Sequence, residues 1–196
     1  MIEKIYTKTG IVSGNPFSSE KVLHIGCGGS KLAGAVGMDI LSLPNVDVIH
    51  DANKVPWPFG DGSFDIIFAH SVVEHLDNIV DFVNEAYRVG KNGGRIIINV
   101  PYFRSVDSFG DPTHAHFFTS KSFEYFLDDH NKLANYKYTS VKLHKVGFWY
   151  GWPQVSPNPL VRILKKFIHR YMDFYDQFLS IIIPVKCLVW ELEIKK

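Results

Sequence analysis

The chain has 196 residues, of which 46% are hydrophobic and 21% charged, and its formal net charge is +1. This composition is typical of a globular protein and excludes a disordered or collagen-like chain. The balanced charge gives no field that would recruit nucleic acid. Two cysteines are too few for a disulfide framework, and the first residues contain no apolar targeting segment. The sequence therefore predicts a cytoplasmic protein that does not bind nucleic acid.

Short apolar runs alternate with turns over the first hundred residues. Five of these runs are predicted to form strands: Val22–Gly26, Ala35–Ile40, Val46–His50, Phe64–Ala69 and Arg95–Val100. One amphipathic helix is expected between the last two strands, starting at an N-cap on Asp77 or Asn78 and continuing through Tyr87. A strand, a helix and a second strand in this order predict a parallel sheet with a right-handed crossover.

The second half is predicted to contain further helices and strands. Expected in order are a short helix (Ser120–Asp128), a strand (Tyr136–Val146), a Pro-rich break (Gly151–Pro159), an amphipathic helix (Leu160–Leu179) and a last strand (Lys186–Ile194). We expect one α/β domain over residues 1–196. Its parts would be a cofactor-binding core (21–101), a substrate loop and helix (102–135) and a helical insertion (151–184).

A glycine-rich turn follows the first predicted strand, in the run VLHIGCGGS. Glycines there allow the backbone to approach a ligand closely, at the sheet edge where open α/β folds bind ligands. Asp39 ends the second strand and Asp51 follows the third, so both are expected at the same edge. A carboxylate in the position of Asp39 can accept hydrogen bonds from ribose hydroxyls, and Asp51 can accept one from an adenine amino group.

The spacing of this turn favours a nucleoside over a dinucleotide. Lys31 stands where a dinucleotide site has its third glycine, and Asp39 comes too soon after Gly26 for the dinucleotide pattern. The sequence also lacks a P-loop motif. S-adenosylmethionine is a nucleoside ligand without phosphates that fits such a turn.

Several segments in series resemble the class I S-adenosylmethionine-dependent methyltransferases. They are VLHIGCGG, GMDIL, DVIHDANKVPWPFGDGSFDIIFAHSVVEHL and NEAYRVGKNGGRIIINVP. The resemblance implies a Rossmann-like, doubly wound, mostly parallel seven-stranded sheet with an antiparallel last strand. It implies S-adenosylmethionine contacts at Ile25, Gly26, Cys27, Gly28, Asp39, Ile40, Asp51, Ala52, His70 and Ser71. Because only residues 29–34 separate the glycine turn from the next strand, the first helix is expected to be cut to about one turn.

A long segment, Pro101–Phe126, follows the fifth predicted strand at the ligand edge of the sheet. Its stretch DPTHAHFFT looks like one found in methyltransferases of sugar and surface-polysaccharide biosynthesis. A histidine suits removal of a proton from a hydroxyl acceptor at neutral pH. We therefore expect His114 to be the general base, His116 to be second to it and Asp111 to orient the base. His75 is interpreted as a residue that shapes the cofactor pocket.

Other interpretations of these residues remain open. Asp111 can simply cap a turn, and Asp111, His114 and His116 have a spacing that metal ligands use, although the expected site contains no metal. The basic helix at 160–179 is either packed on the domain or in contact with a membrane or a lipid-linked substrate. A cofactor-binding protein without catalysis and a nucleotide-dependent oxidoreductase are the alternative functions.

Overall fold

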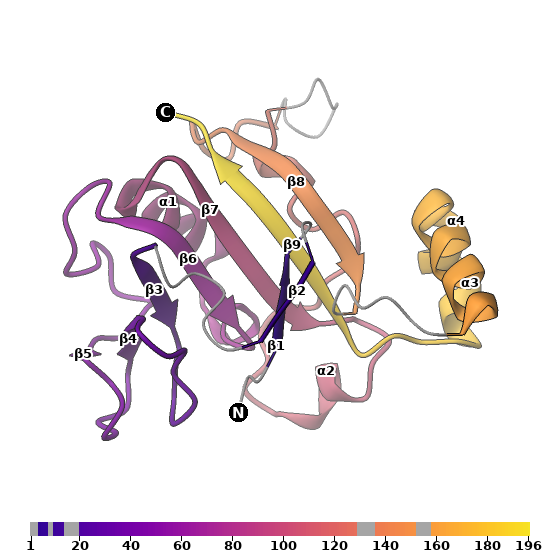
Figure 1. The fold of residues 1–196 in the computed structure, drawn as a ribbon, viewed down its shortest axis with the longest axis horizontal. Coiled ribbons are helices and arrows are strands. Elements are labelled where there is room, and N and C mark those ends of the chain that lie inside the picture. The colour runs from indigo at the N-terminus through magenta and orange to yellow at the C-terminus, as the bar shows by residue number, and fades with distance from the viewer. Residues whose placement is uncertain (1–3, 8–9, 14–19, 129–135, 152–157) are drawn as a thin grey trace.

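A seven-stranded sheet forms the centre of the computed structural model, which describes residues 4–7, 10–13, 20–128, 136–151 and 158–196 (Figure 1). The strands of this sheet are β3 (Val22–Ile25), β4 (Val36–Asp39), β5 (Val48–Ile49), β6 (Phe64–His70), β7 (Gly90–Pro101), β8 (Leu143–Tyr150) and β9 (Cys187–Ile194). A separate hairpin contains β1 (Lys4–Thr7) and β2 (Gly10–Ser13). The helices are α1 (Ile79–Val89), α2 (Asp107–Gly110), α3 (Pro159–Arg170) and α4 (Met172–Gln177). The 3₁₀ turns are η1 (Val73–His75), η2 (Glu124–Phe126) and η4 (Leu179–Ile181).

The strand order is β5-β4-β3-β6-β7-β9-β8. The first five strands in this order are parallel, whereas β9 is antiparallel to both of its neighbours. This arrangement confirms the predicted doubly wound sheet with an antiparallel last strand. The helical insertion also lies where it was expected, because α3, α4 and η4 come between β8 and β9.

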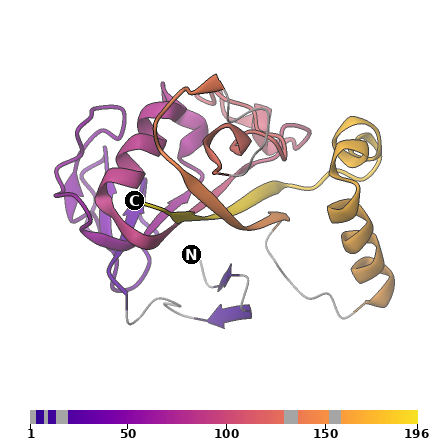
Figure 2. The same cartoon turned by 90° about the horizontal axis from the view of Figure 1, so that it is seen from above.

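The two faces of the sheet are buried by different parts of the chain. On one face, Ile67 and Ile96 pack in the same buried cluster as Phe82 and Val83 of α1. The side chain of Asn78, one of the two predicted N-cap residues, caps this helix by accepting a hydrogen bond from the amide of Val80 at 2.9 Å. On the other face, a smaller cluster contains Val22, Leu32, Ala35, Ile66, Phe68, Ile97 and Val189. Figure 2 shows the β1–β2 hairpin on this second face, opposite α1.

Several predicted elements differ from the structure. Residues 26–35 form turns only, so the single helical turn predicted for the first crossover is absent. The strand predicted at Tyr136–Val146 was wrong at both ends, since β8 is Leu143–Tyr150. Leu143 pairs with Ile194 at the end of β9, so earlier residues have no partner strand to extend along. The helix predicted at Ser120–Asp128 is only the 3₁₀ turn η2.

The amphipathic helix predicted at Leu160–Leu179 is divided in two. α3 ends at Arg170, and Tyr171 has a non-helical backbone (φ −124°, ψ 55°) before α4 begins. The predicted break at Gly151–Pro159 lies largely outside the described residues, as does the end of the predicted substrate segment, residues 129–135. Within the described parts, no helix is long and apolar enough to cross a membrane.

Candidate functional site

The glycine turn after β3 is held against the ends of its two neighbouring strands. The amide of Gly26 donates to the carbonyl of Met38 at 2.8 Å, and Gly26 has a φ of 62°. A Cβ at this position would lie 2.4 Å from Cγ2 of Val72, which follows β6. Only glycine therefore fits where β3, β4 and β6 come together. The predicted contacts Ile25, Gly26, Cys27 and Gly28 lie at this shared edge.

Asp39, at the end of β4, lies directly beside this turn. Its side chain is 9% exposed, and its two carboxylate oxygens accept the amides of Gly28 at 2.8 Å and Leu41 at 2.9 Å. Each oxygen keeps a second lone pair for a further donor. A Cβ added at Gly28 or Gly29 would meet no atom within 4 Å, and Ile40 is 63% exposed. An open glycine backbone beside a fixed carboxylate and an exposed apolar side chain fits the ribose and base of a nucleoside.

Asp51 and Ala52 follow β5 at the same edge. The amide of His50 donates to the carbonyl of Asp39 at 2.9 Å, which fixes the end of β5 beside β4. The carboxylate of Asp51 accepts the amide of Asn53 at 3.0 Å and so closes a local turn. The structure therefore places Asp51 close to Asp39 and also gives it the turn-forming role expected of such an aspartate.

His70 ends β6, the strand on the other side of β3 from β4, and Ser71 follows it. Ser71 has a φ of 49°, and its amide donates to the carbonyl of Asn99 in β7 at 3.0 Å. Burial lowers the pKa of His70, so its ring is neutral near pH 7. Both residues lie at the predicted edge of the sheet.

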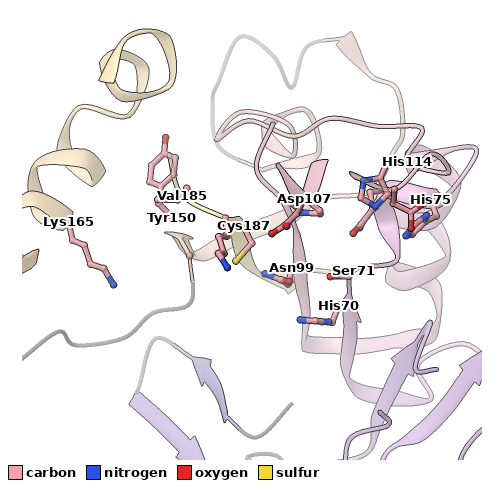
Figure 3. Close-up of a pocket in the computed structure, with 15 residues that line it drawn as sticks. His70, Ser71, His75, Asn99, Asp107, His114, Tyr150, Lys165, Val185 and Cys187 are labelled. Carbon is pink, nitrogen blue, oxygen red and sulfur yellow. The ribbon is translucent and has the colours of Figure 1, made fainter. Parts of the chain in front are cut away.

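A cavity of about 700 Å³ opens beside His70 and Ser71. It is lined by His70, Ser71, Glu74, His75, Asn99, Pro101, Asp107, Asp111, His114, Tyr150, Gly151, Lys165, Val185, Lys186 and Cys187. Figure 3 shows His75 and His114 together at one end of this cavity and Lys165 of α3 at the other. The glycine turn, Asp39, Asp51 and His116 are not among its lining residues. The cavity thus adjoins one end of the predicted nucleoside site and extends away from it.

His75 and His114, at one end of the cavity, are oriented by hydrogen bonds at their Nδ1 atoms. Nδ1 of His114 lies 3.0 Å from the carbonyl oxygen of Ser108, which can only accept, so this nitrogen carries the proton. Nδ1 of His75 lies 2.8 Å from Oγ1 of Thr113, and this hydroxyl donates to Asp111 at 2.7 Å. In the neutral form of each ring, the lone pair is therefore on Nε2. The ring centroids are 4.6 Å apart.

Asp111 has a different partner from the one predicted. It contacts Thr113 through two hydrogen bonds, and the Thr113 hydroxyl holds the pKa of its carboxyl below the usual range. Through that hydroxyl Asp111 orients His75, not His114. The backbone of Asp111 still closes the turn, since its carbonyl accepts the amide of His114 at 3.3 Å.

The sequence analysis missed Glu74, which is 1% exposed and lines the cavity beside the two histidines. Neither of its carboxylate oxygens has a hydrogen-bond partner among the described residues. Burial raises the pKa of Glu74 to about 7. Its backbone carbonyl accepts the amides of Ala115 at 2.8 Å and His116 at 3.2 Å, which fixes the long loop against η1. The sequence did contain one sign of this residue, because Glu74 and His75 follow closely on the end of β6, at the ligand edge of the sheet.

His116 does not belong to this group. It lines a separate cavity of about 340 Å³ together with Phe117, Phe118 and Tyr125. Residues 114–117 are not a strand, so the His-x-His spacing does not bring both rings to one side. The proposed second role of His116 and its place in a metal-ligand set with Asp111 and His114 are therefore not supported by its position.

Comparisons with known proteins agree with this architecture. A family model described as a methyltransferase domain matches residues 23–98. A probable S-adenosylmethionine-dependent methyltransferase from Mycolicibacterium smegmatis is 31% identical over 97 residues, which cover 41% of this chain and 37% of that protein. The mitochondrial ubiquinone biosynthesis O-methyltransferase of Rattus norvegicus is 28% identical over 116 residues, covering 47% of this chain and 34% of the relative. The chain thus spans little more than a third of either relative.

Solved structures share the fold over nearly the whole chain. The YcgJ protein from Bacillus subtilis has a TM-score of 0.53 at 19% identity, with 90% of this chain and 92% of that chain covered. An S-adenosylmethionine-dependent methyltransferase from Archaeoglobus fulgidus has a TM-score of 0.54 at 18% identity, with 91% and 88% covered. The family match over residues 23–98, the shared fold and the glycine and aspartate geometry at the sheet edge together support a class I S-adenosylmethionine-dependent methyltransferase.

Proposed function

We propose that this protein is a methyltransferase that transfers the methyl group of S-adenosylmethionine to a hydroxyl of a small-molecule or sugar acceptor bound in the 700 Å³ cavity. The observation that carries the proposal is the position of this cavity. It begins at His70 and Ser71, at one end of the nucleoside site, and continues to Lys165. An acceptor there would lie beside the cofactor and not across the sheet from it.

The residues that would hold the cofactor follow from the edge geometry. Asp39 would accept the ribose hydroxyls, Gly26 and Gly28 would let the nucleoside approach the backbone, and Asp51 would face the base. When bound, S-adenosylmethionine supplies a methyl group activated by its sulfonium. The protein's contribution is then to align the acceptor and to accept its proton.

Proton removal is assigned to the end of the cavity where His75 and His114 lie. Nδ1 of His75 is hydrogen-bonded to Thr113 and Nδ1 of His114 is hydrogen-bonded to Ser108. Nε2 is therefore the ring atom of each histidine that could accept a proton from a hydroxyl. The relative from Rattus norvegicus is named an O-methyltransferase, which supports an oxygen acceptor. We keep His114, which the sequence suggested, as the proposed general base. Glu74 lines the same end of the cavity and is a second candidate to accept the proton.

A lipid-linked sugar is the acceptor class favoured by α3, α4 and the turn after them. Figures 1 and 2 show α3 and α4 standing beside the rest of the domain, beyond β8 and β9. We call residues 159–183, which include α3, α4 and η4, the helical arm. Large apolar side chains are exposed on this arm: Leu160, Ile163, Phe167, Phe174, Phe178, Ile181 and Ile182. Arg162, Lys166 and Arg170 are exposed on the same arm. Exposed apolar and basic side chains together are typical of a helix that binds an anionic membrane surface.

A transfer assay tests the proposed reaction. The protein is incubated with tritiated-methyl S-adenosylmethionine and a panel of sugars, lipid-linked sugars and phenols. Label in an acceptor hydroxyl supports the proposal. Binding of S-adenosylhomocysteine with no transfer to any class would favour the cofactor-binding alternative, and binding of NAD in its place would favour the oxidoreductase.

Vesicle co-sedimentation tests the acceptor class separately. Phosphatidylglycerol vesicles should sediment the protein at low salt, and phosphatidylcholine vesicles should not. Ile163→Ser combined with Ile182→Ser should abolish sedimentation, whereas Tyr138→Ser, which changes an exposed aromatic residue outside the arm, should have no effect. Equal sedimentation of all three proteins would contradict membrane contact through α3 and α4.

A further inference from the structure

Three groups with free lone pairs meet at one end of the acceptor cavity. One ligand atom each from Glu74, His75 and His114 lies within 4.8 Å of the other two. Glu74 and His75 come from η1 and His114 comes from the long loop, so only the fold brings them together. Hereafter these three residues are called the Glu-His-His cluster.

The hydrogen bonds around this cluster are those that metal-binding histidines use. Such histidines donate their second ring N–H to a carbonyl, carboxylate or similar acceptor, which fixes the tautomer. His114 does so with the carbonyl of Ser108, and His75 does so with the Thr113 hydroxyl, which in turn donates to Asp111. In the neutral form, each ring therefore presents its lone pair on Nε2, the atom that a metal ion would bind.

Glu74 provides an independent sign that a ligand binds here. Only 1% of its surface is exposed, yet neither carboxylate oxygen has a hydrogen-bond partner in the described parts of the chain. A buried carboxylate without a partner is costly, and a bound cation removes that cost. Among the described residues, no lysine or arginine side chain donates a hydrogen bond to it.

We propose that the Glu-His-His cluster binds one divalent transition-metal ion of the zinc type. Two imidazole nitrogens and one carboxylate are a ligand set of catalytic zinc sites, which keep a position open for water or substrate. The open position would face the cavity, where an acceptor hydroxyl could occupy it. A bound divalent ion would make an acceptor hydroxyl more acidic, so that its proton could pass to water, and the ion, with His114 as its ligand, would take over the activating role proposed above for His114. Only this role rests on the proposed function, whereas metal binding does not.

Metal binding is tested without any methyl transfer. The protein is stripped with a chelator and titrated with Zn²⁺ by calorimetry, and with Co²⁺ while its visible absorption is recorded. We expect saturable binding of one equivalent and a cobalt spectrum typical of a nitrogen- and oxygen-ligated site. Glu74→Gln, which preserves the shape of the side chain, and His114→Ala should each abolish saturable binding.

Two further variants keep the test decisive. Thr113→Val removes the group that orients His75 and should weaken Zn²⁺ binding by about 10- to 100-fold without changing a ligand. His116 lies two residues from His114 but lines the other cavity. The His116→Ala variant should therefore bind Zn²⁺ as tightly as the unmodified protein. Absence of one-equivalent binding, or equal binding by Glu74→Gln, His114→Ala and His116→Ala, would overturn the proposal. Neither outcome would affect the transfer assay with S-adenosylmethionine.

Discussion

The backbone amide of Gly28 donates a hydrogen bond of 2.8 Å to the carboxylate of Asp39, which joins the glycine turn after β3 to the end of β4. The bond fixes the carboxylate on the side of the turn where Cβ space is open. Together with the bond from the Gly26 amide to the Met38 carbonyl, it connects two strand ends between which residues 26–35 form turns and no helix. Asp39 is therefore the buried side chain that holds the glycine turn in place.

Asp39→Ala should weaken binding of S-adenosylhomocysteine by about 2 kcal/mol or more, because it removes charge-assisted hydrogen bonds to the ribose. Calorimetric titration measures the change. Asp61→Ala, which alters an exposed aspartate paired with Arg88, is the matched control and should bind normally. An Asp39→Ala protein that melts cooperatively and binds with unchanged affinity would rule out the ribose assignment.

Asp51→Asn should narrow the preference for adenosyl over inosyl ligands. The carboxylate of Asp51 would accept the adenine amino group, and the amide that replaces it is a weaker acceptor and also a donor. The ratio of the dissociation constants of S-adenosylhomocysteine and its inosine analogue measures this preference. If the ratio is the same in the mutant, the base is recognised elsewhere and Asp51 only closes its turn with Asn53.

His114→Ala should lower turnover by about 10²- to 10⁴-fold, whether the imidazole accepts the proton itself or binds the activating ion. Affinity for S-adenosylhomocysteine should change little, because Asp39 and the glycine turn do not line the same cavity. His116→Ala is the control from the same loop and should retain most activity. Full turnover by His114→Ala would remove the histidine from the mechanism.

His24 should make the protein less stable in acid. The ring is 1% exposed, its Nδ1 accepts the amide of Leu32, and burial lowers its pKa to about 4. Between its ordinary pKa near 6.5 and about 4, the unfolded chain binds a proton that the folded chain does not. The free energy of unfolding should therefore decrease as the pH is lowered through this window, and His24 should account for up to about 3 kcal/mol of the decrease.

His24→Asn keeps an acceptor for Leu32 and removes the titration. It should be less stable than the unmodified protein at pH 7 because it loses the packing of the ring on Phe68. The difference between the two proteins should shrink as pH falls toward 4. Urea unfolding at several pH values measures it, and a constant difference would show that His24 does not cause the acid sensitivity.

Asp176 should be essential for holding α4 against the domain. Its carboxylate accepts the hydroxyls of Tyr102 at 2.9 Å and Tyr150 at 2.8 Å, and both the amide and the hydroxyl of Ser120. Asp176→Ala should lower the free energy of unfolding by about 3 kcal/mol, because it leaves several buried donors without a partner. Asp173→Ala removes only the exposed ion pair with Lys121 and should cost less than about 1 kcal/mol. Equal losses in urea unfolding would contradict this assignment.

The sequence by itself determined the parallel part of the sheet and its ligand edge. Strands such as Phe64–His70 are buried on both faces, so they appear as continuous apolar runs, and the turn residues that end them mark the edge directly. The capping of α1 by Asn78 was likewise a local property. The position of Asp39 could be predicted because a residue at the end of a parallel strand lies at the ligand edge of the sheet.

The tertiary structure alone decided which side chains share the cavity. His114 and His116 are two residues apart, yet they face different cavities because the chain between them is not a strand. Glu74 joins His114 because its carbonyl holds the amide of Ala115, a contact between segments about forty residues apart. The bounds of β8 likewise depended on its pairing with β9. Such long-range contacts leave no periodic pattern in the sequence, and so the end of the cavity that contains Glu74, His75 and His114 could be recognised only from the fold.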